Sequence, residues 1–119
     1  MIYHLTTLAD WQADPGRPYA PASLADEGFV HCSPDETVTL AVANAFYRGL
    51  ADPVVLQIDE NALSCEVRAE VAAPAPPPGV AADVLFPHVF GPIDRSAVVG
   101  LLDARRDDSG RCAELEPRG

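Results

Sequence analysis

The sequence predicts an α+β domain built on a curved, mostly antiparallel sheet of about six short strands with one main helix. Short runs of apolar and β-branched residues recur along the chain and are separated by turn residues, which indicates strands. Only residues 33–49 combine helical spacing with clear start and stop signals. The chain has 119 residues, enough for one domain with its own core, so we expect residues 1–119 to form a single domain.

The first third of the chain alternates short strands with short helices. The predicted elements, in order, are a strand at residues 2–6, a short helix at 7–13, a loop at 14–18, a brief helix from a Ser23 cap to a closing Gly28, and a strand at 29–32. Because side chains alternate along a strand, His4 and Thr6 share one face of the first strand. His31 and Ser33 share one face of the second strand for the same reason.

The main helix is predicted to start with a capping box. Ser33 supplies the N-cap hydroxyl, Pro34 takes the first helical position and Glu36 lies three residues after the cap. An apolar stripe follows at helical spacing, formed by Val38, Ala41, Val42, Ala45 and Phe46. Gly49 ends the helix, and we expect the stripe and the neighbouring Tyr47 to pack in or near the core.

The second half of the chain is predicted to be mainly β-structure. The elements, in order, are a buried strand at residues 54–58, an alternating strand at 66–71, a stiff extended loop at 72–79, a strand at 86–90, a helical turn at 94–96, a strand at 97–104 and an edge strand at 111–115. For residues 97–104 the periodicity leaves a short buried helix open as the alternative. Arg68 and Glu70 share one face of the alternating strand. Residues 107–110 have the chemistry of a hairpin turn.

Composition limits the classes of function. Eight arginines, no lysine and eighteen acidic residues give a formal net charge of −10. Non-specific DNA or RNA binding depends on a basic surface, so we exclude it. No apolar run approaches the roughly 20 residues that cross a bilayer, so we expect no membrane segment. Because we see no export signal, we expect Cys32, Cys65 and Cys112 to be reduced thiols in a cytoplasm.

The three histidines are the strongest indication of a functional site. His4, His31 and His88 each interrupt an apolar, strand-like run. Each ring nitrogen of a neutral imidazole needs a partner, so histidine suits a pocket wall better than a strand core. If the strands share one sheet, a polar set lines one concave face, formed by His4, Thr6, His31, Ser33, Arg68 and Glu70. A helix N-terminus at Ser33 would also attract an anion such as phosphate.

Other interpretations of these residues stay open. The polar side chains could simply face water on a half-exposed sheet, and His88 could fix the turn that follows it by bonding a backbone carbonyl. A zinc site is disfavoured, because the histidines are far apart in the sequence and form no close pair, so no metal is expected. Nucleophilic catalysis by Cys32 is disfavoured, because alternation points its thiol toward the core.

Five segments of the chain resemble a bacterial family. They are residues 2–5, 23–33, 43–47, 68–70 and 86–93, and their most specific motifs are His31-Cys32-Ser33 and the segment around His88. From about residue 2 to residue 104 the chain resembles domain-of-unknown-function family 952. This family consists of small uncharacterised proteins with no established activity, so the resemblance implies no function.

A second resemblance bears on function. A histidine in the first strand, a His-x-Ser at the end of the second strand and a glutamate on a later strand resemble the ADP-ribosyltransferase superfold, nearest to its RNA 2′-phosphotransferase branch. The resemblance implies that His4 holds the nicotinamide-side ribose of NAD, that His31 with Ser33 orients the cofactor, and that Glu70 polarises the attacked ribose. The phosphotransferase branch uses several arginines against phosphate, whereas only Arg68 lies near a matching place here, which counts against an RNA substrate.

These residues together predict a domain that binds NAD or a related ADP-ribose-containing nucleotide in a histidine-lined cleft and transfers or hydrolyses its ADP-ribose. The candidate catalytic residues are His4, His31 and Glu70. The candidate cofactor-binding residues are Thr6, Ser33, Arg68, His88 and Tyr19, with Tyr19 as a stacking partner for a base or nicotinamide ring. The alternatives are a non-catalytic module that binds a nucleotide or a partner protein and, less favoured, a metal-binding protein.

Overall fold

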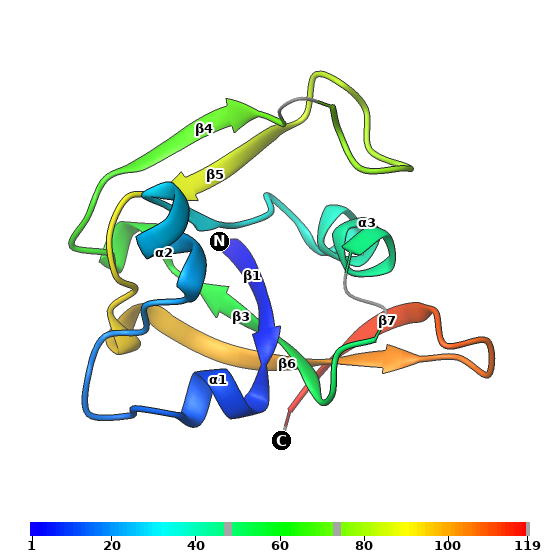
Figure 1. Ribbon diagram of the computed structural model, residues 1–119, viewed down its shortest axis with the longest axis horizontal. Coiled ribbons are helices and arrows are strands. Elements are labelled where there is room, and N and C mark those ends of the chain that lie inside the picture. The colour runs from blue at the N-terminus through cyan, green and yellow to red at the C-terminus, as the bar shows by residue number, and fades with distance from the viewer. Residues whose placement is uncertain (47–48, 73–74, 119) are drawn as a thin grey trace.

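The computed structural model describes residues 1–46, 49–72 and 75–118 (Figure 1). Its strands are β1 (Ile2–Thr7), β2 (Val30–His31), β3 (Pro53–Ile58), β4 (Val67–Val71), β5 (Leu85–Val89), β6 (Val98–Arg106) and β7 (Cys112–Pro117). Its helices are α1 (Leu8–Gln12), α2 (Ala22–Glu27) and α3 (Glu36–Phe46), with single 3-10 turns η1 (Glu60–Ala62) and η2 (Arg95–Ala97). Every strand and helix that the sequence predicts has a counterpart among these elements.

The strands form two antiparallel sheets. One sheet has four strands in the order β1-β3-β6-β7, and the other has three strands in the order β2-β5-β4 (Figure 1). The α+β class and the antiparallel pairing are therefore confirmed, but the single sheet of about six strands is wrong. The reason lies in β2, which pairs with β5 over only two residues. The chain then crosses to β1, where Ser33 forms an isolated bridge with Tyr3.

The core lies between the two sheets. β3 sits between β1 and β6, and its Val54, Val55, Leu56 and Ile58 are fully buried at 0% exposure. A continuous apolar run of this kind is typical of a strand covered on both faces. Val30 of β2 and Val89 of β5 belong to the same core cluster as Leu56 and Ile58, so the second sheet presents its apolar face to the first.

Register in the second sheet decides where its polar side chains lie. Val30 and Val67 both pair with Val89, and this apolar row packs in or against the core. The next row along the strands pairs His31 and Arg68 with His88. Because successive side chains point to opposite faces, this second row points away from the core. His31 and His88 are thus cross-strand neighbours.

The predicted helix caps need correction. Asp35 caps α3, because its Oδ1 accepts a hydrogen bond of 2.8 Å from the Val38 N–H. Ser33 does not cap it, since its backbone exchanges hydrogen bonds of 2.7 and 3.0 Å with Tyr3 and so belongs to the sheet. The N-cap of α2 is Pro21 and not Ser23, because the helix already begins at residue 22.

The buried face of α3 also differs from the predicted apolar stripe. Its buried residues are Val38, Thr39 and Ala43, whereas the Phe46 side chain is 66% exposed. Val38 is thus the one residue of the predicted stripe that is buried. Tyr47, which was predicted to pack in or near the core, lies outside the described residues. Residues 73–74 of the predicted loop at 72–79 lie outside them as well. No helix in the described part of the chain is long and apolar enough to cross a membrane.

Candidate functional site

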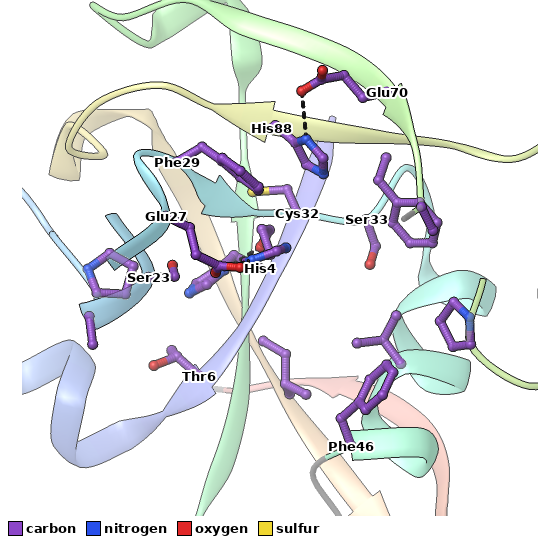
Figure 2. A pocket seen from close by; sticks show the side chains of 18 of the residues that line it. His4, Thr6, Ser23, Glu27, Phe29, Cys32, Ser33, Phe46, Glu70 and His88 are labelled. Atoms are coloured by element: carbon purple, nitrogen blue, oxygen red, sulfur yellow. Dashed lines mark hydrogen bonds and ion pairs between the residues drawn. The ribbon is translucent and has the colours of Figure 1, made fainter. Parts of the chain in front are cut away.

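A cleft of about 700 Å³ opens between β1, α2, α3 and the second sheet (Figure 2). This volume lies within the range of small-molecule sites. The cleft brings together seven of the eight predicted site residues, namely His4, Thr6, Tyr19, His31, Ser33, Glu70 and His88. Arg68 is the predicted residue that is not among its lining. The set comes from both sheets, so it is assembled by their packing and not by one strand face.

His4 forms part of the cleft wall but is itself buried, at 7% exposure. Its Nδ1 lies 2.6 Å from the carbonyl oxygen of His31 and its Nε2 lies 3.2 Å from the Tyr19 hydroxyl. A carbonyl only accepts, so Nδ1 carries the proton of the neutral ring. Burial lowers the pKa of His4 from its ordinary value of 6.5 to about 4, which keeps the ring neutral near pH 7. Both nitrogens of His4 therefore have partners inside the protein.

Tyr19 and Thr6 complete this buried network. The Tyr19 hydroxyl lies within hydrogen-bond distance of Thr6 Oγ1, at 2.8 Å. The Tyr19 ring is buried and contacts the rings of His4 and Trp11, at centroid distances of 5.5 and 5.7 Å. Its backbone pairs with Ile93 through hydrogen bonds of 2.9 and 2.8 Å, so the residue is fixed in the core at the base of the cleft. The network ties β1 to the backbone of His31.

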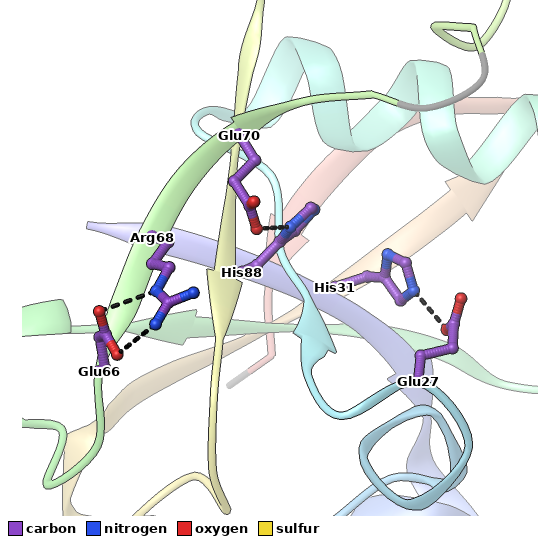
Figure 3. A network of polar contacts seen from close by, with 6 residues as sticks. All are labelled: Glu27, His31, Glu66, Arg68, Glu70 and His88. Atoms are coloured by element: carbon purple, nitrogen blue, oxygen red, sulfur yellow. Dashed lines mark hydrogen bonds and ion pairs between the residues drawn. The ribbon is translucent and has the colours of Figure 1, made fainter.

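The first of two carboxylate–imidazole pairs joins Glu70 on β4 to His88 on β5 (Figures 2 and 3). The Nδ1 of His88 lies 2.8 Å from Glu70 Oε1. An ionised carboxylate only accepts, so Nδ1–H donates and Nε2 is left with a lone pair. The side chain of His88 is 12% exposed and that of Glu70 is 46% exposed. This pair thus presents a shielded imidazole whose tautomer is set by its partner.

The second pair joins Glu27, the last residue of α2, to His31 on β2 (Figure 3). The Nε2 of His31 lies 2.6 Å from Glu27 Oε2, and both side chains are 51% exposed. Gly28 makes the pair possible, because its left-handed backbone (φ 89°) ends the helix and reverses the chain into the strand. By sequence alone, Glu27 is only the residue before Gly28, in the last turn of the predicted brief helix. The sequence feature that could have indicated the pair is the position of Glu27 four residues before His31, with the helix-closing Gly28 between them.

Phe29 holds the two imidazoles at a fixed spacing. Its ring stacks on His88 at a centroid distance of 4.2 Å and contacts His31 at 4.7 Å. The two imidazole centroids are 5.7 Å apart. Phe29 packs in turn on Phe90 at 5.5 Å, which anchors it to the second sheet. Nothing in the sequence marks Phe29 as a site residue, because a lone aromatic in a strand is most simply core.

Arg68 lies outside the cleft, where its guanidinium is bound by Glu66, the residue before β4. Its guanidinium donates to both carboxylate oxygens of Glu66 at 2.8 and 3.1 Å and lies over the Phe90 ring at 4.7 Å. The charged side chains among the described lining residues are instead the carboxylates of Asp10, Glu27 and Glu70. Because Arg68 is bonded to Glu66 and does not line the cleft, its position does not support the predicted role in binding the cofactor.

The cysteines of the described chain carry no evident chemistry. All three are free, and burial raises the pKa of the Cys32 thiol far above its usual range, which disfavours the reactive thiolate. Cys32 lies in the core cluster, as alternation along its strand predicts. Among the residues that the structure describes, no three His, Cys, Asp or Glu side chains gather as metal ligands would.

Comparison with known proteins adds a family and a fold. The sequence profile of the family described as "Protein of unknown function (DUF952)" matches residues 5–101. Two crystal structures of protein CC0527 from Caulobacter crescentus are similar to this chain, one of a double mutant at 23% identity with a TM-score of 0.74, the other at 25% identity with a TM-score of 0.72. Each similarity covers 98% of this chain and 92% of the other. No curated protein matches the chain.

Proposed function

The chain belongs to the DUF952 family of proteins of unknown function, and we propose that its cleft binds NAD or a related ADP-ribose-containing nucleotide and cleaves the nicotinamide–ribose bond. The observation that carries the proposal is the pair of carboxylate-oriented imidazoles, His31 and His88, which face one cleft with their centroids 5.7 Å apart. Paired titratable groups in a concave site are the usual mark of acid–base chemistry.

Cleavage of this bond places positive charge on the ribose. As in glycoside hydrolysis, the sugar develops oxocarbenium character while the bond to the leaving group breaks. The carboxylate of Glu70 is suited to stabilise that charge, and the free Nε2 of His88 is suited to bond a ribose hydroxyl. Ser33 adds a hydroxyl to the same wall of the cleft. In this proposal the acidic lining favours the cationic nicotinamide ring of NAD.

The buried network has a supporting role in the same proposal. His4 has no nitrogen left for a ribose, because its two nitrogens bond the His31 carbonyl and Tyr19. It therefore acts by holding His31 in place, with Thr6 and Tyr19 holding His4 in turn. The three free cysteines support a reducing compartment such as the cytoplasm as the place of action.

A second candidate function is a non-catalytic module that holds a nucleotide or a partner protein. Large apolar side chains at the edge of the cleft favour it, since Phe46 and Val71 line the cleft and yet are more than half exposed. Leu85 pairs with Val71 across the second sheet and is half exposed as well. Exposed apolar side chains of this kind are typical of binding surfaces.

The test combines NAD binding with nicotinamide release. We expect calorimetry to detect NAD binding and chromatography to detect free nicotinamide. The Glu70→Gln variant should lower kcat by about 10²-fold, because a neutral amide no longer stabilises the ribose cation. Glu66→Gln is the matched control, since Glu66 precedes β4 by one residue, is similarly exposed and pairs with Arg68 outside the cleft. It should keep the kcat of the unmodified protein.

The alternatives predict different outcomes. Tight binding without nicotinamide release, unchanged in Glu70→Gln, would replace the enzyme with the binding module. No binding at millimolar NAD would reject both candidates for this ligand. Equal loss of activity in Glu66→Gln and Glu70→Gln would mean that the charge of the strand matters and not the pair with His88.

A further inference from the structure

We infer that the second substrate of this cleft is an oxygen nucleophile, water or an alcohol hydroxyl, and that the Glu27–His31 pair takes its proton. The inference rests on the proposed function and adds the acceptor to it. Three observations support this inference. They are the tautomer that Glu27 imposes on His31, the exposure of the His31 side chain, and the distance between the rings of His31 and His88.

Glu27 leaves His31 ready to accept a proton. The carboxylate lies 2.6 Å from Nε2, so Nε2–H donates to it and the lone pair of the neutral ring resides on Nδ1. For Nδ1 we find no hydrogen-bond partner among the residues that the structure describes. A histidine oriented by a carboxylate through one nitrogen and open at the other is the arrangement of a general base. Glu27 is then a positioning residue that acts through His31.

Exposure separates the roles of the two pairs. The His31 side chain is 51% exposed, whereas that of His88 is 12% exposed and stacked on Phe29. An acceptor arriving from solvent therefore meets His31 first. The 5.7 Å between the imidazole centroids lets an acceptor at His31 lie next to a ribose held at His88. Reacting atoms need to approach to about 3–3.5 Å, which this spacing allows.

The presence of a base selects the class of acceptor. A hydroxyl or water must lose a proton when it attacks, so it gains from an imidazole beside it. A guanidinium stays protonated well beyond the range of an imidazole base, and a carboxylate acceptor has no proton to lose. The charged or titratable groups around His31 are Glu27 on α2, His88 on β5, Glu70 on β4 and His4 on β1. The carboxylates of Glu27 and Glu70 also repel an anionic acceptor.

The step balances without any further reactant. The acceptor oxygen forms a bond to C1′ of the ribose while its proton passes to Nδ1 of His31. The bond between C1′ and the nicotinamide nitrogen breaks, and its electron pair stays on that nitrogen, so the pyridinium leaves as neutral nicotinamide. The imidazolium of His31, held by the Glu27 carboxylate, then releases the proton to solvent.

The test measures nicotinamide release from saturating NAD in four proteins. We expect His31→Gln and Glu27→Gln to lower kcat by about 10²-fold while KM stays within about threefold, because the base acts on the acceptor and not on NAD binding. His31→Gln should also remove the acidic limb of the pH–rate profile, which a purely structural role would not do. Asp26→Asn is the control, because Asp26 is an exposed acid of the same helix that does not line the cleft.

Product analysis identifies the acceptor class. ADP-ribose alone in the presence of methanol would support water, whereas O-methyl-ADP-ribose would support an alcohol hydroxyl. Preferential capture by agmatine would overturn the inference, because an imidazole is too weak a base to deprotonate its guanidinium. Unchanged kcat and pH profile in His31→Gln would also overturn it, while the proposed function would stand. If the unmodified protein released no nicotinamide, the proposed function would fail and this inference with it.

Discussion

At the scale of single residues, the three histidines that line the cleft differ in how many ring nitrogens are bonded within the protein. His4 is 7% exposed and bonded at both nitrogens, whereas His31 and His88 each keep one nitrogen without a partner among the described residues. Their sequence surroundings are alike, with apolar neighbours on each side. The difference arises from the position of each strand in its sheet, which a local pattern does not contain.

The buried His4 makes a prediction about stability and pH. Its pKa is about 4 in the folded protein and 6.5 in an unfolded chain, so the unfolded state binds a proton first as the pH falls. The stabilisation is complete above pH 6.5 and is lost between pH 6.5 and 4, by about 3 kcal/mol in the free energy of unfolding. Urea unfolding at several pH values across this window measures the loss.

The control for this prediction is His4→Asn. The amide of asparagine keeps a donor near the position of Nδ1 but has no proton to gain in this range. The His4→Asn variant should have a lower free energy of unfolding at pH 7 than the unmodified protein. Between pH 7 and pH 4 its free energy of unfolding should fall by about 3 kcal/mol less. Parallel pH curves for the two proteins would show that His4 does not titrate as its burial implies.

At the scale of elements, the turn from α2 to β2 builds half of the site. Gly28 ends the helix with φ 89°, and an added Cβ there would meet nothing within 4 Å. Gly28→Ala should therefore lower the free energy of unfolding by about 1–2 kcal/mol through backbone strain alone. Gly28→Asn should cost less, because asparagine tolerates this conformation. Denaturant unfolding measures both.

Gly16→Ala is the matched control for the turn. Gly16 also has open space around its Cβ position, but its φ does not lie in the left-handed region. Alanine there should leave stability unchanged or raise it slightly, since it restricts only the unfolded chain. A loss equal to that of Gly28→Ala would mean that glycine flexibility, and not the left-handed turn, is what the protein needs.

Elements were more predictable than the contacts between them. β3 could be found from the sequence because Val54, Val55 and Leu56 form an unbroken apolar run, and the end of α2 because Gly28 closes it. The cap of α3 was misplaced, because Ser33 and Asp35 are equally good capping residues and only pairing with Tyr3 removes Ser33 from the helix. Local chemistry proposes a cap, and tertiary pairing decides which residue takes it.

The same reasoning explains which parts of the site were predictable. His31 and His88 could be selected because polar residues in apolar strands are unusual, and Glu70 through the resemblance to the ADP-ribosyltransferase superfold. Glu27 and Phe29 could not, because a glutamate on a short helix and a phenylalanine in a strand are ordinary. Arg68 lies in the same row as His88, as predicted, but its guanidinium bonds Glu66 and does not line the cleft, which the strand pattern alone does not show.

At the scale of the whole molecule, two sheets that pack face to face produce the cleft. β2 and β5 pair although more than fifty residues separate them, and the pairing of β1 with β3 is also distant in sequence. Non-local pairing of this kind is set by the combined burial of many strands and not by any one of them. The cleft therefore depends on the global fold, and we expect its binding capacity and the fold to be lost together in denaturant.

The charge of the whole molecule makes a final prediction. A net charge of −10 on a molecule with principal extents of 38 × 33 × 24 Å produces self-repulsion in the folded state. The screening length is about 30 Å at 0.01 M salt, comparable to the molecule, and about 10 Å at 0.1 M. The Tm at pH 7 should therefore rise between 0.01 and 0.1 M sodium chloride, by about 4–8 °C for each kcal/mol of repulsion that salt removes. Calorimetry at pH 4.4, the isoelectric point of the sequence, is the control, because there the net charge and its salt dependence vanish. An equal rise at both pH values would assign the effect to the salt itself and not to the charge of the protein.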